Sequence, residues 1–321
     1  MKVGNETLPQ FFIISYHRPQ QMKTLTWLRR INYPMKNVHV VIDDEGGDEE
    51  QYRKTCADYG CELHVFEMKE ARRRFDFIHR KSKGRRAAGL ARNAIYDIAF
   101  SLGIRRWVIT DDDTSRYSVK YPAMKERACS EDEFKSVLMM VFDMMDRKHI
   151  GFFGLPQSGD FIGGVKCAKW FIWKVMNTTF VDARYVYKPE RGVQDDDTSA
   201  FVGIMNEGYF TASLGYGVSL HQTASATQAG GLTDNYRENK LLNKSLICPI
   251  QFPSAIYANY QRKNGGRLHH TIEHKYLMPC VLKVAKEERS NLAWDAYPED
   301  VVFRNDRRRD IVVDDERNSP N

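Results

Sequence analysis

Four short, largely apolar segments constrain the fold of this chain more than any other feature. They are residues 10–15, 38–42, 62–66 and 106–110. Helical patterns lie between them, at residues 20–30, 49–59 and 89–100. Apolar strands that alternate with helices are typical of a parallel sheet covered on both faces. The sequence therefore predicts an α/β protein with a mostly parallel, Rossmann-like central sheet and helices on both faces.

The composition narrows the class of protein. Hydrophobic residues make up 42% and charged residues 28% of the 321 residues, which excludes disorder throughout. No apolar run approaches the roughly 18–20 residues of a membrane crossing, and the first ten residues do not resemble a signal peptide. The six cysteines are scattered without a CxxC pair, as is typical of reduced thiols. We therefore expect a cytoplasmic protein with no membrane partner.

Two of the predicted strands end in acidic clusters. Asp43 and Asp44 follow the second strand, and Asp111 to Asp113 follow the strand at 106–110. Ligands of open α/β sheets bind beyond the carboxyl ends of the strands, so both clusters fall where a ligand is expected. Asp43 and Asp44 could hydrogen-bond a nucleotide base or ribose. Taken alone, however, they are better interpreted as part of a charged loop.

The triple aspartate is the stronger candidate for a metal site. Side chains alternate along a strand, so Asp111 and Asp113 are expected to converge while Asp112 points elsewhere. Paired carboxylates suit Mg²⁺ or Mn²⁺ bridging to a phosphate. The alternative is a solvated acidic turn. The buried strand before the cluster favours the metal, because a cation would offset the repulsion between three carboxylates.

The motifs SYHRP, IDDEGGD and GLARNAIYDIAFSLGIRRWVITDDDT, in this order, resemble the GT-A nucleotide-sugar glycosyltransferases. The resemblance covers roughly residues 10–225. It implies a GT-A domain, which we place at residues 1–250, followed by a C-terminal extension at 251–321. It also implies that Asp111 and Asp113 hold Mn²⁺ or Mg²⁺ and the donor diphosphate. The donor-binding residues that it implies, with a UDP-sugar as the expected donor, are Asp43, Asp44, Arg92, Asn93, Asp112, Gly163 and Gly164.

Two later features match further parts of the same pattern. Many of these enzymes have an acidic motif that opens a helix and supplies the catalytic base, and QDDDTS at 194–199 resembles it. Asp195 or Asp196 would then be the base, although acidic residues also stabilise the first turn of any helix. A late histidine ligates the metal in several members, and His221 occupies the corresponding place. By contrast, the run HHTIEH at 269–274 is predicted to form a solvated face.

A basic patch bears on the acceptor. Between Lys69 and Arg92 the sequence contains ten Lys and Arg residues and two acidic residues. The local charge is therefore +8, in a chain of net charge +6. A diphosphate needs one or two cations, so this excess favours a polyanionic acceptor. The candidate nucleic-acid-binding residues are Arg72, Arg73, Arg74, Arg80, Lys81, Lys83, Arg85 and Arg86. The alternative is a solvated basic loop.

With this patch and the motif LHQTASATQAGG at residues 220–231, the chain is similar to the phage TET-associated glycosyltransferases. The resemblance implies transfer of a sugar to DNA that carries a hydroxymethylated pyrimidine such as 5-hydroxymethylcytosine. Two alternatives remain open: a glycosyltransferase with a non-DNA glycan acceptor, and a non-catalytic DNA-binding module. A nucleotidyltransferase is disfavoured by the ARN helix and the late histidine.

Overall fold

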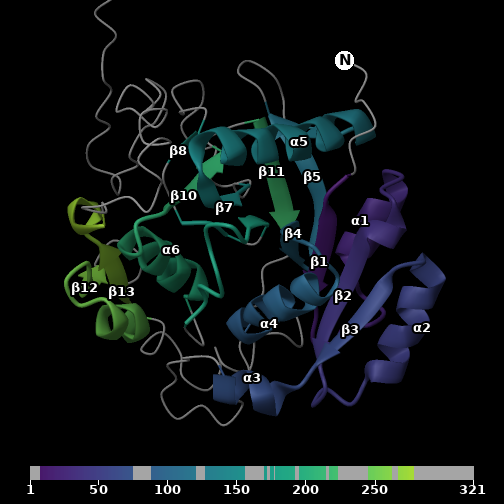
Figure 1. The fold of residues 1–321 in the computed structure, drawn as a ribbon, viewed down its shortest axis with the longest axis horizontal. Coiled ribbons are helices and arrows are strands. Elements are labelled where there is room, and N and C mark those ends of the chain that lie inside the picture. Colours follow the sequence, from purple (N-terminus) through teal and green to yellow (C-terminus); the bar gives the residue numbers. More distant parts are fainter. Residues whose placement is uncertain are drawn as a thin grey trace, which may run out of the picture.

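An eight-stranded sheet runs through the centre of the molecule, with strand order β3-β2-β1-β4-β9-β7-β10-β8 (Figure 1). The computed structural model describes residues 8–74, 88–120, 127–155, 170–171, 174–176, 178–191, 195–214, 217–222, 245–261 and 267–277. The strands of this sheet are β1 (Gln10–Ile14), β2 (Val38–Asp43), β3 (Glu62–Phe66), β4 (Arg106–Asp111), β7 (Ile150–Gly154), β8 (Trp170–Phe171), β9 (Thr179–Asp182) and β10 (Phe210–Leu214). All four predicted strands are present. Most neighbours pair in parallel, but β9 runs antiparallel to β4 and β7, and β8 runs antiparallel to β10.

Helices cover both faces of this sheet, as the sequence predicts. They are α1 (Lys23–Arg30), α2 (Glu49–Tyr59), α3 (Met68–Arg74), α4 (Ala88–Ser101), α5 (Glu131–Lys148) and α6 (Asp196–Asn206). Alternate side chains of β1 point to opposite faces of the sheet. Phe11 packs in the apolar core that includes α1 and α5, whereas Phe12 packs in the core that includes α4. Both faces of β1 are therefore buried, which explains why its sequence is continuously apolar. Among the described residues, no helix is both long and apolar enough to cross a membrane.

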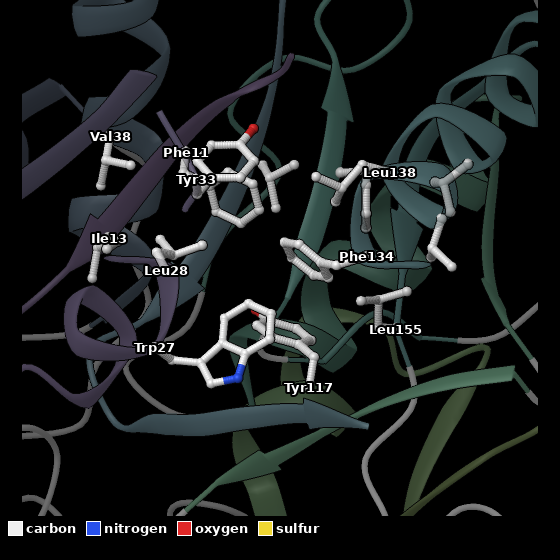
Figure 2. Packing of buried hydrophobic residues seen from close by; sticks show 14 of the residues in the cluster. Phe11, Ile13, Trp27, Leu28, Tyr33, Val38, Tyr117, Phe134, Leu138 and Leu155 are labelled. Atoms are coloured by element: carbon white, nitrogen blue, oxygen red, sulfur yellow. The ribbon is translucent and has the colours of Figure 1, made fainter. Parts of the chain in front are cut away.

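An aromatic cluster packs a second, three-stranded sheet against helices α1 and α5 (Figure 2). The rings of Trp27 in α1, Tyr117 in β5 (Thr114–Lys120) and Phe134 in α5 are 4.8 Å apart, centroid to centroid, in every pairing. Beside β5 lie β11 (Gly217–Gln222) and β6 (Arg127–Ala128), which complete a three-stranded sheet. Because β5 begins directly after Asp113, this cluster anchors the outgoing side of the acidic turn.

Two described segments, residues 245–261 and 267–277, pack against α6. A two-stranded sheet forms from β12 (Ile256–Gln261) and β13 (Arg267–Ile272), and residues 245–251 are helical. Cys248, Ile256 and Leu277 share an apolar cluster with Phe201 and Met205 of α6. The helical residues 245–251 thus cross the expected domain boundary at residue 250, and the following segment buries one side of α6. The expected extension beyond residue 277 lies outside the described residues.

The capping box at the start of α5 generates a prediction about pH. Glu133 accepts a hydrogen bond from the Ser130 backbone and two from Arg127, at 2.7 and 2.5 Å, and Arg127 lowers the pKa of Glu133 to about 2. A depressed carboxyl pKa stabilises the folded state above the unfolded pKa near 4.5, and this stabilisation is lost as the pH falls towards 2. Glu133→Gln keeps the cap but removes the charge. We expect it to lower the free energy of unfolding at pH 7 by roughly 1 kcal/mol or less.

The measurement is urea unfolding of the wild type and Glu133→Gln at pH 7, 5, 4 and 3. The difference between them should shrink below pH 4.5. Glu49→Gln, which removes one member of an exposed pair with Arg53, is the matched control and should show no comparable pH dependence. A Glu133→Gln difference that stays constant down to pH 3 would contradict the assignment.

Candidate functional site

Arg92 joins two acidic segments at the carboxyl edge of the sheet. From α4 its guanidinium donates a hydrogen bond of 3.0 Å to Asp111 at the end of β4, and a second bond to Asp196 at the start of α6. All three side chains are at least three-quarters buried. Burial acts to lower the pKa of Arg92, but Asp196 and Asp111 raise it above its usual value. Arg92 therefore stays charged and holds both carboxylates in one place.

A buried glutamate that the sequence analysis missed lies beside this cluster. Glu190 is 4% exposed, and its Oε2 atom has no hydrogen-bond partner in the described part of the chain. Burial, followed by the charge of Asp196, raises the pKa of Glu190 well above its usual value, although Arg92 opposes the shift. Burial also raises the pKa of Asp196. The site thus carries more acidic groups than its cations neutralise. No sequence motif marks Glu190, so its role is visible only in three dimensions.

Asn93, the neighbour of Arg92, holds the loop that carries Glu190. Its Nδ2 atom donates to the Glu190 carbonyl at 2.8 Å, and its Oδ1 atom accepts from the Glu190 amide at 3.3 Å. The side chain is fully buried. Asn93, expected from the resemblance to lie beside the donor, therefore has its amide bonded to protein backbone, and it positions the loop next to Arg92.

The strand alternation expected for the triple aspartate stops at Asp111. Strand β4 ends there, and Asp112 and Asp113 form a turn into β5. Because a turn does not keep the two-residue period of a strand, Asp112 and Asp113 lie near the same cation: Arg18 Nη1 is 3.1 Å from Asp112 Oδ1 and 3.8 Å from Asp113 Oδ2. Asp111 instead contacts Arg92. Strand alternation, the reason given for convergence, therefore ends at Asp111, and the convergence of Asp111 and Asp113 stays a prediction.

Arg18 and Ser15, from the loop after β1, are further site residues that the motif analysis did not single out. Ser15 Oγ donates a 2.5 Å hydrogen bond to Asp112 Oδ2, and Tyr52 OH lies 2.6 Å from the same hydroxyl. Burial raises the pKa of Asp112, while Ser15 and Arg18 oppose the rise. Both residues fall in the SYHRP motif, which is the signal that could have identified them.

Thr24 of α1 fixes the backbone of the acidic turn. Its hydroxyl donates to the Asp111 carbonyl at 2.6 Å and accepts from the Thr114 amide at 3.1 Å, and its own amide donates to the Asp112 carbonyl at 3.1 Å. Thr24 itself is fully buried. The turn is thus held on both sides by one side chain, which limits how its carboxylates can move.

The first acidic cluster divides into two roles. Asp44 Oδ1 accepts a 2.9 Å hydrogen bond from the Met68 amide at the start of α3, so this side chain caps a helix. Asp43 is 8% exposed and accepts from the Glu45 amide at 2.9 Å, and burial raises its pKa. Of the two, Asp43 is the one whose carboxyl is not bonded to a helix start.

Asp195 and Asp196 face different surroundings although they are adjacent. Asp195 has a left-handed backbone (φ 56°) and its Oδ2 atom lies 3.2 Å from His270 Nδ1 of β13. His270 Nε2 lies within 3.5 Å of the Thr198 hydroxyl. The expectation of a solvated face at 269–274 is wrong for His270, which is 7% exposed because β13 packs its side chain against the start of α6. Of these two aspartates, Asp196 is the one that accepts a hydrogen bond from Arg92.

The described arginines of the basic patch are all paired with acidic side chains. Arg72 donates two hydrogen bonds to Glu45, at 2.8 and 2.9 Å, Arg73 pairs with Glu70 at 3.0 Å, and Arg74 lies 3.5 Å from Asp97. Glu45 and Asp97 lie outside the range 69–92 and each offset one charge of the local +8, from which Glu70 was already subtracted. The remaining patch residues and the predicted glycine loop lie outside the described residues: Arg80, Lys81, Lys83, Arg85, Arg86, Gly163 and Gly164.

His221 lies in β11, where its backbone pairs with Arg116, and the next residue, Gln222, pairs with Thr114. The strand pairing therefore brings the chain at His221 close to the acidic turn. The position of its side chain is outside the described part of the structure.

The side chains at this edge offer the oxygen ligands that a hard divalent cation takes, but among the described residues no three of these carboxylates place ligand atoms within 4.8 Å of one another. Only oxygen ligands are offered here, by Asp111, Asp112, Asp113 and Asp196. The guanidiniums of Arg18 and Arg92 form ion pairs with these carboxylates and neutralise part of their negative charge. Oxygen ligands suit Mg²⁺ and Mn²⁺. The upward pKa shifts of Asp112 and Asp196 show that negative charge here is costly, and a bound cation would offset that cost.

The sheet and its acidic carboxyl edge define an α/β protein of the class that binds ligands beyond its parallel strands. The model of the TET-associated glycosyltransferase family matches residues 10–231. The chain belongs to this family and is a glycosyltransferase, and the predicted α/β class with a mostly parallel central sheet is confirmed. A comparison with curated proteins found no match.

Two solved structures resemble the chain at low identity. One is a glucosyl-3-phosphoglycerate synthase from Mycobacterium tuberculosis in complex with Mn²⁺, UDP and phosphoglyceric acid, with a TM-score of 0.43 and 7% identity over 82% of this chain and 87% of that one. The other is a cytidylyltransferase from Leptospira borgpetersenii serovar Hardjo-bovis, with a TM-score of 0.38 and 11% identity over 75% of this chain and 87% of that one.

The buried position of Arg18 generates a stability prediction. Arg18→Ala leaves Asp112 and Asp113 without their shared cation, and removing one partner of a buried ion pair costs about 3–5 kcal/mol. We expect a loss of unfolding free energy in this range, measured by chemical denaturation. Arg53→Ala removes an exposed pair with Glu49 and should cost about 0.5 kcal/mol or less. Equal losses for the two variants would contradict the account of the acidic turn.

Proposed function

We propose that this glycosyltransferase moves a sugar from a nucleotide-sugar donor, in a metal-dependent reaction, to a hydroxyl on a hydroxymethylated pyrimidine in DNA. The family match supports the sugar transfer. The observation that carries the metal dependence is the carboxylate cluster around Arg92 and Arg18. The DNA acceptor is supported by the family to which the chain belongs and by the basic sequence between Lys69 and Arg92.

Asp111 and Asp113 would hold Mn²⁺ or Mg²⁺, with His221 as a further ligand. The cation supplies Lewis-acid neutralisation of the charge that develops on the diphosphate leaving group. Arg92 places a fixed positive charge at the same edge, beside Asp111. Asp43, buried at the end of β2, is the preferred partner for the donor's base or ribose, since Asp44 is bonded to the start of α3. Gly163 and Gly164 would let the donor sugar approach the backbone closely.

Asp196 is the preferred catalytic base for an inverting transfer. It shares the site with Asp111 through Arg92, whereas Asp195 lies beside His270. In the reaction, the acceptor hydroxyl gives its proton to the Asp196 carboxylate while its oxygen bonds to C1 of the sugar. The bond from C1 to the diphosphate oxygen breaks, and the nucleoside diphosphate leaves with the electron pair. Burial raises the pKa of Asp196, which makes its carboxylate a stronger proton acceptor.

A duplex acceptor would have to be opened at the target base. The hydroxymethyl group of a stacked pyrimidine cannot reach a site recessed at a sheet edge, so the nucleotide would be flipped out of the helix. Backbone contacts would fall to Arg80, Lys81, Lys83, Arg85 and Arg86. The ion pairs of Arg72, Arg73 and Arg74 leave these three less available for phosphates. That observation favours, as the second candidate, a glycosyltransferase whose acceptor is a non-DNA glycan.

The test is release of nucleoside diphosphate from a panel of nucleotide sugars with Mn²⁺, with and without DNA containing 5-hydroxymethylcytosine. We expect turnover only with the modified DNA, and at least a 100-fold loss in Asp111→Asn. Asp143→Asn, which alters an exposed pair with Arg147, is the matched control and should retain full activity. Turnover that needs no DNA would overturn the DNA acceptor and favour the glycan. Salt-sensitive DNA binding without turnover of any donor would favour a binding module.

Comparing Asp196→Asn with Asp195→Asn tests which aspartate is the catalytic base. We expect Asp196→Asn to lower kcat by at least 100-fold with little change in the KM for the donor, because the variant keeps the shape of the side chain but cannot accept the proton. Asp195→Asn should keep most of kcat, because that side chain faces His270. Steady-state kinetics of both variants measure the split. The reverse pattern would assign the base to Asp195.

A further inference from the structure

Three side chains with metal-binding atoms converge at the amino end of the sheet, away from the acidic edge. His39 lies near the start of β2, while Glu62 and His64 lie on β3, the edge strand. The register pairs His39 with Glu62 and Val41 with His64, so all three side chains project from the same face. Within the described residues, this is the group of three or more His, Cys, Asp or Glu residues whose ligand atoms lie within 4.8 Å of one another.

The distances between these atoms match a tetrahedral site. His39 Nδ1 lies 2.9 Å from His64 Nε2 and 3.3 Å from Glu62 Oε2, and His64 Nε2 lies 3.5 Å from the same carboxylate oxygen. Bonds of about 2.0–2.1 Å around tetrahedral Zn²⁺ place neighbouring ligand atoms about 3.3 Å apart. The three observed separations surround this value, so an ion could enter with small side-chain movements.

The surroundings of His39 orient it as a ligand. Its Nε2 atom bonds to Gln10 Oε1 at 2.9 Å, and since an amide oxygen only accepts, Nε2 carries the proton. The lone pair of Nδ1 therefore faces His64 and Glu62. Metal-binding histidines commonly donate their second ring N–H to such an acceptor. The ring is also stacked on Phe12, with centroids 4.6 Å apart and planes 16° from parallel.

The site combines a fixed interior with an open side. The His39 side chain is 5% exposed and that of His64 is 19% exposed, while that of Glu62 is 57% exposed and gives solvent access. Burial and then His64 lower the pKa of His39 to about 4, and burial lowers the pKa of His64.

We propose that His39, Glu62 and His64 form a structural Zn²⁺ site, with water as the fourth ligand, that fastens the edge strand β3 to β2. Two imidazole nitrogens and one carboxylate oxygen are a donor set that Zn²⁺ accepts readily, unlike the all-oxygen set at the carboxyl edge. His39 lies near the start of β2 and Asp43 ends it, so the two sites occupy opposite ends of one strand. The proposal does not depend on which sugar or acceptor the enzyme uses.

The experiment measures Zn²⁺ binding to the full chain after dialysis against a chelator, by competition with a chromophoric indicator. We expect the wild type to bind one Zn²⁺ tightly at this site, and His64→Gln and Glu62→Gln to weaken binding there by at least tenfold. His17→Asn is the matched control: it removes an exposed histidine that lies 3.2 Å from Asp48, and asparagine tolerates the left-handed backbone there. This control should bind Zn²⁺ as the wild type does.

Two further measurements separate loss of the site from loss of the fold. Glu62 is exposed, so Glu62→Gln should fold normally by circular dichroism, and Zn²⁺ should raise the melting temperature of the wild type more than that of this variant. Co²⁺ should give the visible spectrum of a tetrahedral site in the wild type and in Asp111→Asn, but not in His64→Gln. Equal Zn²⁺ affinity in the wild type and His64→Gln would overturn the proposal, as would a Co²⁺ spectrum lost in Asp111→Asn.

Discussion

The ion pairs of Arg92 with Asp111 and Asp196 are the interaction on which the active edge depends. They join α4 and β4, which follow each other in the chain, to the start of α6, where Asp196 lies 104 residues after Arg92. Such a buried cation is tolerated only because two carboxylates compensate for its desolvation. Asn93, on the next position of α4, then holds the loop of Glu190 against the same point. Two neighbouring residues of α4, Arg92 and Asn93, thus hold Asp111, Asp196 and the loop of Glu190 together.

The central sheet separates two chemistries along its strands. At its carboxyl edge, buried carboxylates pair with the guanidiniums of Arg18 and Arg92, and the proposed cation and diphosphate would bind there. At the amino end of β2 and β3, imidazole nitrogens dominate. The apolar interior of β1 and β2, fully buried on both faces, isolates the two ends from each other. The acidic turn that follows β4 is held by α1 through the hydrogen bonds of Thr24.

Much of the fold could be predicted from local sequence, because short apolar strands and the helices between them are written in consecutive residues. The acidic clusters at strand ends followed from the same reasoning, and the order of motifs indicated the family. Glu190 and the burial of His270 could not be predicted, since each depends on contacts between distant segments. Arg18, by contrast, lies in the SYHRP motif, which could have identified it. Alternation failed at Asp113 because a turn replaces the strand after Asp111, and no periodicity in the residues marks where that happens.

The most direct test of the central claim is the affinity of Mn²⁺ for the protein in the presence of UDP, followed by electron paramagnetic resonance as the signal of free Mn²⁺ disappears. The account predicts that the wild type and Asp143→Asn bind one Mn²⁺ with the same affinity, and that Asp111→Asn binds it at least tenfold more weakly. Equal affinity in Asp111→Asn would show that the carboxyl edge around Arg92 is not where the cation binds, and would contradict the account.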